Sequence, residues 1–155
     1  MITIVQRVLH ASVQVDGRDI AAIGRGLMLL VGVERGDTEN CARTTALKLS
    51  KLRCFPGRTP MDATCAEIGG GCLVISQFTL AAELADGNRP SFSAAEDPTL
   101  AEALYLQVAE SLREQGLEVS TGVFGAKMAV TLCNDGPVTF ALTVRGGKVQ
   151  RRPTT

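Results

Sequence analysis

Continuous apolar runs and short β-rich segments predict most of the strands in this chain. Leu27–Val33 and Cys72–Ser76 are uninterrupted apolar runs, which are typical of strands buried on both faces. Ile2–Leu9 and Ser12–Val15 are rich in β-branched residues and lie close together in the sequence, so they predict an opening pair of strands. The Pro- and Gly-rich stretch from Pro56 to about Gly71 predicts a loop before the second buried strand.

Two segments have the spacing of helices that bury one face. Asp37 or Thr38 is the expected cap of the first, which extends to about Arg53. Asp97 at the N-cap and Pro98 at the first helical position predict the start of the second. The inward positions are Ala42, Ala46, Leu49 and Arg53 in the first helix, and Leu100, Leu104, Val108 and Leu112 in the second, which Gly116 ends.

Two further strands are expected near the end, Met128–Cys133 and Val138–Val144. In the latter, alternate residues face inward, namely Val138, Phe140, Leu142 and Val144. The predicted order is two strands, two βα units and then more strands (ββ-(βα)2-β), which indicates an α/β fold with a mixed sheet and two helices packed on one face. We expect residues 1–145 to form a single domain and residues 146–155 a basic, flexible C-terminal tail.

Composition and charge exclude several classes of protein. The chain has 155 residues, enough for one well-packed domain, and its 45% apolar and 21% charged content argues against disorder. Sixteen basic residues balance sixteen acidic ones, so the broad positive field of a non-specific nucleic-acid binder is missing, although a local patch could still hold an RNA end. The longest apolar run is too short for a bilayer and no secretory leader is apparent, so we expect a cytoplasmic protein.

The residues that usually carry catalysis or bind metals are sparse. The five cysteines are odd in number and include no Cys-x-x-Cys pair, which predicts reduced thiols. His10 has no evident partner for a triad and is interpreted as a surface or turn residue. Metal-spaced His/Cys clusters and phosphate-binding loops are also missing, so neither a metal nor a cofactor is predicted.

Two segments are unusual for purely structural elements. Ser76-Gln-Phe-Thr-Leu80 places hydroxyls and an amide at the carboxyl end of a buried strand, where they could line a pocket or simply satisfy the strand edge. Asn134-Asp-Gly-Pro-Val-Thr139 carries a hairpin signal, but Pro137 removes a backbone donor and makes a cis peptide feasible. Taken alone, this second segment is equally well interpreted as an ordinary turn.

With these segments, the chain resembles D-aminoacyl-tRNA deacylases over roughly residues 1 to 145. The other matching pieces are Ile4-Val-Gln-Arg-Val8 with Ala11-Ser-Val13, Leu52-Arg53 with Phe55, Gly87-Asn-Arg-Pro-Ser-Phe92, and Thr121-Gly-x-Phe-Gly-Ala126 with Met128. A sister family that acts on mischarged L-alanine has Pro-Gln-Ala-Thr in place of Ser76-Gln-Phe-Thr79 and a different residue after Gly-Pro. Ser76, Phe78 and Val138 therefore favour the D-specific branch.

This resemblance implies a three-layer fold, a homodimer with its active site at the subunit interface, and a role in proofreading during translation. Enzymes of the family hydrolyse the ester between a D-amino acid, or glycine, and the 3′ end of a tRNA such as tRNA(Ala). The ester is already activated, and family knowledge assigns the catalytic help to the 2′-hydroxyl of the substrate's own ribose. The protein's share would then be positioning, which can supply about 7–11 kcal/mol of a barrier.

The resemblance also implies how L-amino acids are excluded. The Gly136–Pro137 peptide would be cis and would enter the active site of the other subunit, where its two carbonyls hold the substrate ammonium. An L side chain would collide with this fixed backbone, whereas a D side chain would point to solvent. Arg7 matches the family arginine that steadies the segment, and its alternative is an ordinary surface arginine on a strand.

Residues Ser76, Gln77, Phe78 and Thr79 would form the wall that receives the terminal adenosine and the ester, with Phe78 packing on adenine. Phe124 and Met128 correspond to family positions in the same pocket, and their alternative is a place in the core. Thr79 would position or stabilise the substrate in preference to attacking it, because no adjacent base activates its hydroxyl. The competing hypothesis from another class is a non-catalytic dimeric module that binds tRNA ends or another protein.

Overall fold

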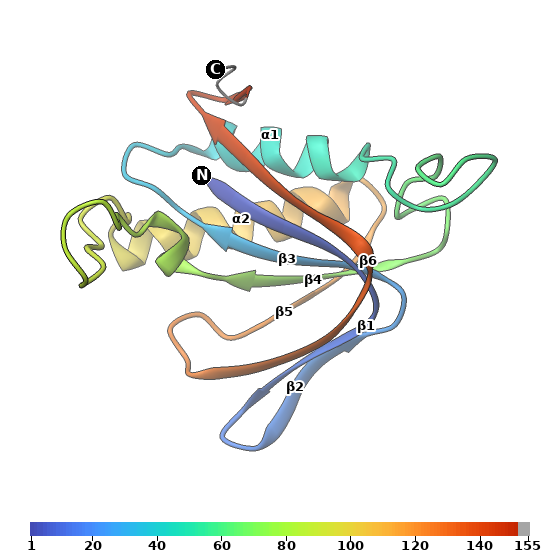
Figure 1. Cartoon of the computed structure of the whole chain (residues 1–155), viewed down its shortest axis with the longest axis horizontal. Coiled ribbons are helices and arrows are strands. Elements are labelled where there is room, and N and C mark those ends of the chain that lie inside the picture. The colour runs from blue at the N-terminus through green and yellow to red at the C-terminus, as the bar shows by residue number, and fades with distance from the viewer. Residues whose placement is uncertain (152–155) are drawn as a thin grey trace.

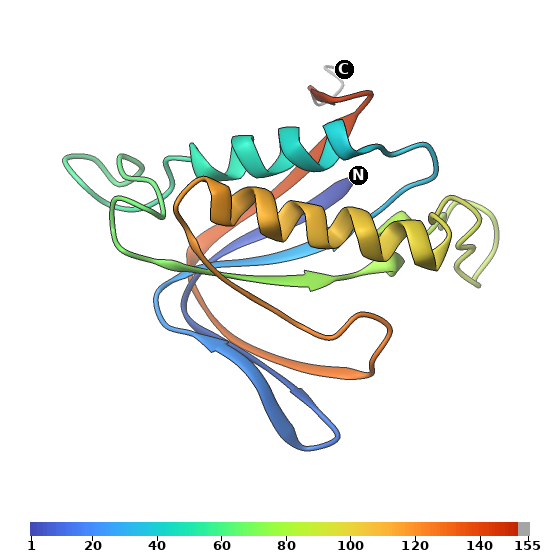
Figure 2. The ribbon, with the colours of Figure 1, turned by 180° about the vertical axis from the view of Figure 1, so that it is seen from behind.

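The two continuous apolar runs form the middle of a seven-stranded mixed sheet in the computed structural model, which describes residues 1–151. They are β3 (Gly26–Gly32) and β4 (Gly71–Ser76), paired in parallel, and their burial on both faces matches the prediction. The other five strands are β1 (Ile2–Val15), β2 (Arg18–Ile23), β5 (Glu118–Thr121), β6 (Met128–Arg145) and β7 (Lys148–Val149). The sheet order is β5-β4-β3-β1-β6-β7, and β2 pairs with β1. The two helices lie together on one face of this sheet (Figures 1 and 2).

Four predicted strands are in fact two long ones. β1 runs over Ile2–Val15 and β6 over Met128–Arg145, and they pair antiparallel from Ile2 opposite Thr143 to Val15 opposite Met128. At the predicted break between Leu9 and Ser12, the pairing is regular from His10 opposite Cys133 to Ser12 opposite Thr131. The predicted break at residues 134–137 is a bulge, where the register shifts between Gln6 and Val8 without ending the strands. The two strands curve together, so that the second half of β1 and the first half of β6 bend away from the helices (Figure 1).

Three short strands were not predicted. β2 (Arg18–Ile23) contains only two β-branched residues, and β5 (Glu118–Thr121) is short and mostly polar. They become strands by pairing with β1 and β4. β7 (Lys148–Val149) folds back on the end of β6, so the expected flexible tail is a paired hairpin over its first part. The remainder of that tail, residues 152–155, lies outside the described residues.

The helices begin as predicted. α1 spans Glu39–Ser50 with Thr38 at its N-cap, and α2 spans Pro98–Glu114, where the Asp97 carboxylate accepts from the N–H of Thr99. The prediction that the first helix reaches Arg53 is wrong. The chain leaves the helix at Lys51, and Cys54 and Phe55 instead bond to Ala63. The 3-10 helix η1 (Phe78–Ala81) follows β4.

Two apolar clusters fill the protein, one on each face of the central strands. Val5, Leu29 and Val74 pack against both helices, whereas Met28 and Ile75 face the curved half of β1 and β6. The layers are therefore helices, central sheet and the curved strands (Figure 2). Phe140 is 38% exposed, contrary to its predicted inward position, because it lies on a part of β6 that forms the edge of the sheet. Leu100 is likewise exposed, at the first turn of α2.

The cysteines and the helices each bear on a prediction from composition. All five cysteines are free and four of them are buried, as the prediction of reduced thiols requires. Within residues 1–151, none of the helices combines the length and apolar character that a bilayer crossing demands.

A buried cluster of charges holds the start of β1. The Met1 ammonium, fully buried, contacts a carboxylate oxygen of Asp37 at 2.7 Å, Glu34 Oε2 at 3.0 Å and the Val144 carbonyl at 2.8 Å. Arg145 Nη2 also donates to Glu34 Oε1 at 2.8 Å. Burial acts to raise the pKa of Glu34, but the hydrogen bonds from Arg145 and the ammonium outweigh it and leave this pKa below its ordinary value.

The lowered pKa of Glu34 predicts how stability depends on pH. A carboxylate with a depressed folded pKa stabilises the fold above its unfolded pKa, and this contribution is lost as the pH falls through the folded value. Glu34→Gln should therefore lower the free energy of unfolding by about 1 kcal/mol near neutral pH. The difference from wild type should shrink below about pH 4.5 in urea titrations. A difference that stays constant down to about pH 3 would contradict this assignment.

Candidate active site

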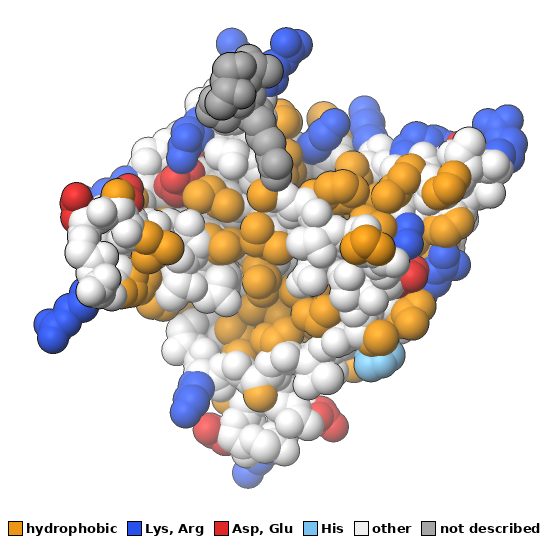
Figure 3. Space-filling view, viewed as in Figure 1, with side chains coloured by type: hydrophobic (Ala, Val, Ile, Leu, Met, Phe, Trp, Pro, Cys, Tyr) orange, Lys and Arg blue, Asp and Glu red, His pale blue; other side chains and the backbone are white. Residues whose placement is uncertain are grey.

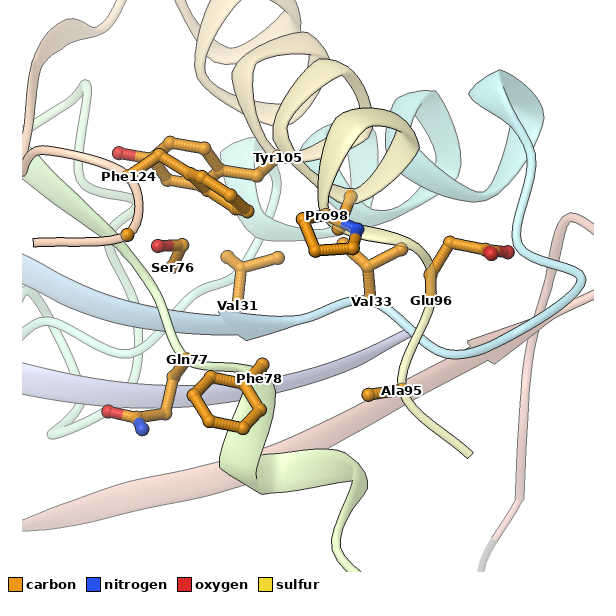
Figure 4. A pocket seen from close by; sticks show the side chains of 12 residues that line it. Val31, Val33, Ser76, Gln77, Phe78, Ala95, Glu96, Pro98, Tyr105 and Phe124 are labelled. Carbon is orange, nitrogen blue, oxygen red and sulfur yellow. The ribbon is translucent and has the colours of Figure 1, made fainter. Parts of the chain in front are cut away.

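An apolar cavity of about 300 Å³ opens at the carboxyl ends of β3 and β4. Strand ends of this kind are where ligands bind in open α/β sheets. Figure 4 shows Val31 and Val33 at its centre, with Phe124 and Tyr105 on one side, Pro98 on the other and Phe78 opposite the helix. The lining residues are Val31, Val33, Ser76, Gln77, Phe78, Ala95, Glu96, Pro98, Ala101, Tyr105, Phe124 and Gly125.

One wall of the cavity is the segment that follows β4. The N–H of Gln77 donates to the Val31 carbonyl at 2.8 Å, which extends the β3–β4 ladder past the end of β4. η1 then turns back over β3, and this close approach requires Gly32. A Cβ at position 32 would lie 2.7 Å from the Cβ of Leu80 and 2.9 Å from the Gln77 carbonyl oxygen. Gly32 therefore allows this wall to settle against the sheet.

Phe78 and Thr79 lie on the outer side of this wall. Phe78 is 58% exposed, and its ring packs edge-on against Phe92 with the centroids 5.1 Å apart. The Phe78 ring thus keeps an accessible surface at the mouth of the cavity, supported from one side. Thr79 is exposed and does not line the cavity, and its hydroxyl accepts a hydrogen bond from the side-chain amide of Gln77.

The opposite wall consists of two aromatic rings. Tyr105 of α2 is buried, and its ring lies 6.1 Å from that of Phe124 between the centroids. The Tyr105 hydroxyl donates to the Val74 carbonyl at 3.1 Å, and burial raises its pKa above the ordinary value. This hydroxyl is therefore a neutral donor already engaged with backbone, and it is poorly suited to act as a base.

Glu96 is the other ionisable side chain among the described residues that line the cavity. Its carboxylate accepts from the N–H of Gly36 at 3.2 Å and from the N–H of Asp97 at 2.8 Å. Histidine and cysteine are not among the lining residues, and His10 is exposed on β1. Over residues 1–151, His, Cys, Asp and Glu side chains do not gather in threes in a way that would hold a metal ion.

The second predicted segment forms a bulge within β6. Between Gln6, opposite Thr139, and Val8, opposite Asn134, the single residue Arg7 faces residues 135–138 of β6. Gly136 and Pro137 are both exposed, and the peptide bond between them is cis, as the sequence allowed. Neither residue lines the cavity of its own chain.

Arg7 anchors this segment, and it is not the surface residue of the alternative interpretation. It is 8% exposed, and its Nε donates to the Asp135 carbonyl at 3.0 Å and also lies 3.0 Å from the Asp135 carboxylate. Its Nη1 donates to the Cys54 carbonyl at 2.6 Å. Burial raises the pKa of the Cys54 thiol to about 11, so this neighbour remains neutral.

The structure therefore separates the predicted site residues into two groups. Ser76, Gln77, Phe78 and Phe124 line one cavity, with Thr79 beside it. Arg7, Gly136 and Pro137 form a second group away from that cavity. Met128 is in neither group, because its side chain packs in the core cluster on the other side of the sheet. The unpredicted lining residues Val31, Val33 and Tyr105 read as core positions in the sequence, since they come from a buried strand and the inward face of a helix.

The chain is similar to known proteins over most of its length. Residues 4–143 match the family described as D-Tyr-tRNA(Tyr) deacylase. The D-aminoacyl-tRNA deacylase of Paracoccus denitrificans is 52% identical over 141 residues, covering 90% of this chain and 95% of the relative. That of Anaeromyxobacter dehalogenans is 51% identical over 146 residues, covering 94% and 98%.

Solved structures have the same fold. One described as a c-Myc DNA unwinding element binding protein has a TM-score of 0.87 at 36% identity and covers 94% of this chain and 100% of its own. A probable eukaryotic D-amino acid tRNA deacylase has a TM-score of 0.76 at 16% identity, covering 90% and 97%, and supports the fold alone. From the match over residues 4–143 and the half-identical relatives, the chain belongs to the D-Tyr-tRNA(Tyr) deacylase family.

Proposed function

We propose that this enzyme, a D-aminoacyl-tRNA deacylase, cleaves D-aminoacyl and glycyl esters from the 3′ end of tRNA with a site completed by a second copy of the chain. The observation that carries the proposal is the separation of the cavity from the Gly136–Pro137 segment within one chain. An exposed, anchored backbone protrusion that does not reach its own cavity is suited to enter the cavity of a partner in a symmetric dimer. The translating cytoplasm is where such a substrate would be met.

Chiral selection would then rest on backbone. The carbonyls of Gly136 and Pro137 would hold the substrate ammonium and leave no room on the side where an L side chain projects. Arg7 supports this role because its contacts with Asp135 fix the base of the segment. Glycine has no Cβ and would escape the collision, so glycyl-tRNA is expected to be a substrate as well.

Ester hydrolysis would draw on the 2′-hydroxyl of the terminal ribose. This is supported by the cavity's own ionisable groups, since the Tyr105 hydroxyl and the Glu96 carboxylate are both engaged by hydrogen bonds. The chain would contribute orientation, with Ser76 and Gln77 beside the ester and Phe78 under the adenine. Thr79 would help to place the amide of Gln77, with which it shares a hydrogen bond.

Hydrolysis of three matched substrates tests the function. D-tyrosyl-tRNA and glycyl-tRNA should lose their esters, and L-tyrosyl-tRNA should be cleaved more than about 100-fold more slowly, because a collision costing only about 3 kcal/mol gives that ratio. Release of the amino acid is followed at equal enzyme concentration. Hydrolysis of none of the three would favour a binding module, and equal hydrolysis of the two tyrosyl esters would remove the chiral filter.

Two substitutions in the wall separate stacking from covalent catalysis. Phe78→Ala should lower kcat/KM about 5- to 150-fold, mainly through KM, because stacking on a base is worth about 1–3 kcal/mol. Thr79→Ala should retain turnover within about tenfold, and Thr79→Ser should resemble wild type. Steady-state kinetics on D-tyrosyl-tRNA measure both. If Thr79→Ala binds tRNA normally but has no turnover, Thr79 is a nucleophile.

Mixing two inactive variants tests the shared site. Gly32→Ala should displace the cavity wall, and Gly136→Ala should displace the segment, where the new Cβ would lie 2.9 Å from the Val138 nitrogen. Co-refolded in equal amounts, they should recover about a quarter of wild-type activity, since about half of the dimers are mixed and each has one intact site. Gly24→Ala is the control, because a Cβ there meets nothing within 4 Å. Failure of the mixture to regain activity would place both parts of the site in one chain.

A further inference from the structure

Basic side chains gather at the end of α1 and in the loop that follows it, although the chain as a whole is neutral. Figure 3 shows Lys and Arg side chains along this edge of the molecule. The members of this basic rim are all exposed, and they are Arg25, Lys48, Lys51, Arg53 and Arg58. Arg25 belongs to it because its guanidinium carbon lies 5.7 Å from the centroid of the Phe55 ring.

The positive charge of the rim is only partly compensated. Asp62 lies 3.6 Å from both Arg53 and Arg58, and Glu67 lies 3.7 Å from Arg53. Exposed pairs at such distances contribute little and exchange easily for another anion. Within residues 1–151, Lys48, Lys51 and Arg25 form no ion pair. Five cations against two carboxylates leave a net positive surface.

The rim is fixed beside the segment that carries Gly136 and Pro137. Cys54 stands between Arg53 and Phe55 in the sequence, and its carbonyl accepts from Arg7 Nη1 at 2.6 Å. The same guanidinium donates from Nε to the Asp135 carbonyl. Two hydrogen bonds on one buried arginine therefore join the rim to the segment.

We propose that the basic rim binds backbone phosphates in the acceptor arm of the tRNA whose 3′ end occupies the partner's cavity. This inference rests on the proposed function, in which the Gly136–Pro137 segment enters that cavity and brings the rim to its entrance. The phosphates that follow the terminal adenosine are then the nearest anions. Lysine and arginine bind such phosphates without regard to sequence, as suits an enzyme that meets many tRNAs.

The test compares a full tRNA with a minimal substrate. Lys51→Gln/Arg58→Gln removes two charges of the rim and leaves Arg53, which holds the loop carboxylates, in place. For D-tyrosyl-tRNA, KM should rise tenfold or more at about 0.1 M salt, and the slope of log KM against log salt should fall by about 2. Hydrolysis of D-tyrosyl-adenosine, which carries no backbone phosphate, should be unchanged within about twofold.

A matched variant removes two charges elsewhere. Arg18→Gln/Lys148→Gln lies on β2 and β7, and it should leave KM and its salt dependence as in wild type. The charge-conserving Lys51→Arg/Arg58→Lys should also resemble wild type. An unchanged KM for Lys51→Gln/Arg58→Gln, or an equal effect of the control variant on KM, would overturn the proposal that the rim binds tRNA phosphates. Equal losses on D-tyrosyl-tRNA and D-tyrosyl-adenosine would overturn it too, since they would indicate a disturbed fold.

Failure of the proposed function has a different signature. In that case the wild-type enzyme itself would leave both esters intact, or the co-refolded glycine variants would stay inactive. Even if the enzyme hydrolyses neither ester, phosphate binding by the rim can be tested by direct binding of tRNA that carries no amino acid. Weaker, less salt-dependent binding by Lys51→Gln/Arg58→Gln than by Arg18→Gln/Lys148→Gln supports the rim, and equal binding overturns it.

Discussion

A single buried guanidinium joins two segments of this protein that are far apart in the sequence. Arg7 satisfies the Cys54 carbonyl on one side and the carbonyl and carboxylate of Asp135 on the other. A charge buried in this way is tolerated only where its donors are paired, so the loop at Cys54 and the bulge of β6 at Asp135 are both fixed to β1. The bulge that contains Gly136 and Pro137 is therefore held at its base by Asp135, which gives the proposed backbone selector the rigidity that it would need.

The central strands and the start of α2 could be predicted because their signals are local. A strand buried on both faces is apolar along its length, whichever strands or helices pack against it. The apolar runs of β3 and β4 and the capped start of α2 at Asp97 are local signals of this kind. β2 and β5 could not be predicted, since β2 has only two β-branched residues and β5 is short and mostly polar. Both become strands only because a neighbouring strand supplies the ladder. The continuity of β1 and β6 was missed because the local sequence pattern changes at residues 10–11 and at residues 134–137, whereas the ladder continues on both sides of each.

The sequence predicted only those cavity residues that belong to a recognisable motif. Ser76 ends β4, Gln77 and Phe78 follow it, and all three line the cavity. Val31, Val33 and Tyr105 complete that cavity, yet nothing in their sequence context distinguishes a pocket wall from a core. Met128 illustrates the reverse case. A residue matched by family position packs on the other face of the sheet, because Met128 is the first residue of a strand that curves away from the helices.

The absence of a side chain at Gly32 fixes the position of one wall of the cavity. Most pockets are shaped by what projects into them, but here one boundary is set by a missing methyl group inside a central strand. Changes among the exposed aromatic residues can alter which molecules enter and how long they stay. The wall formed by η1, by contrast, is set by the close main-chain contact between β3 and η1. Substitutions can therefore change the cavity entrance far more readily than the depth of the cavity.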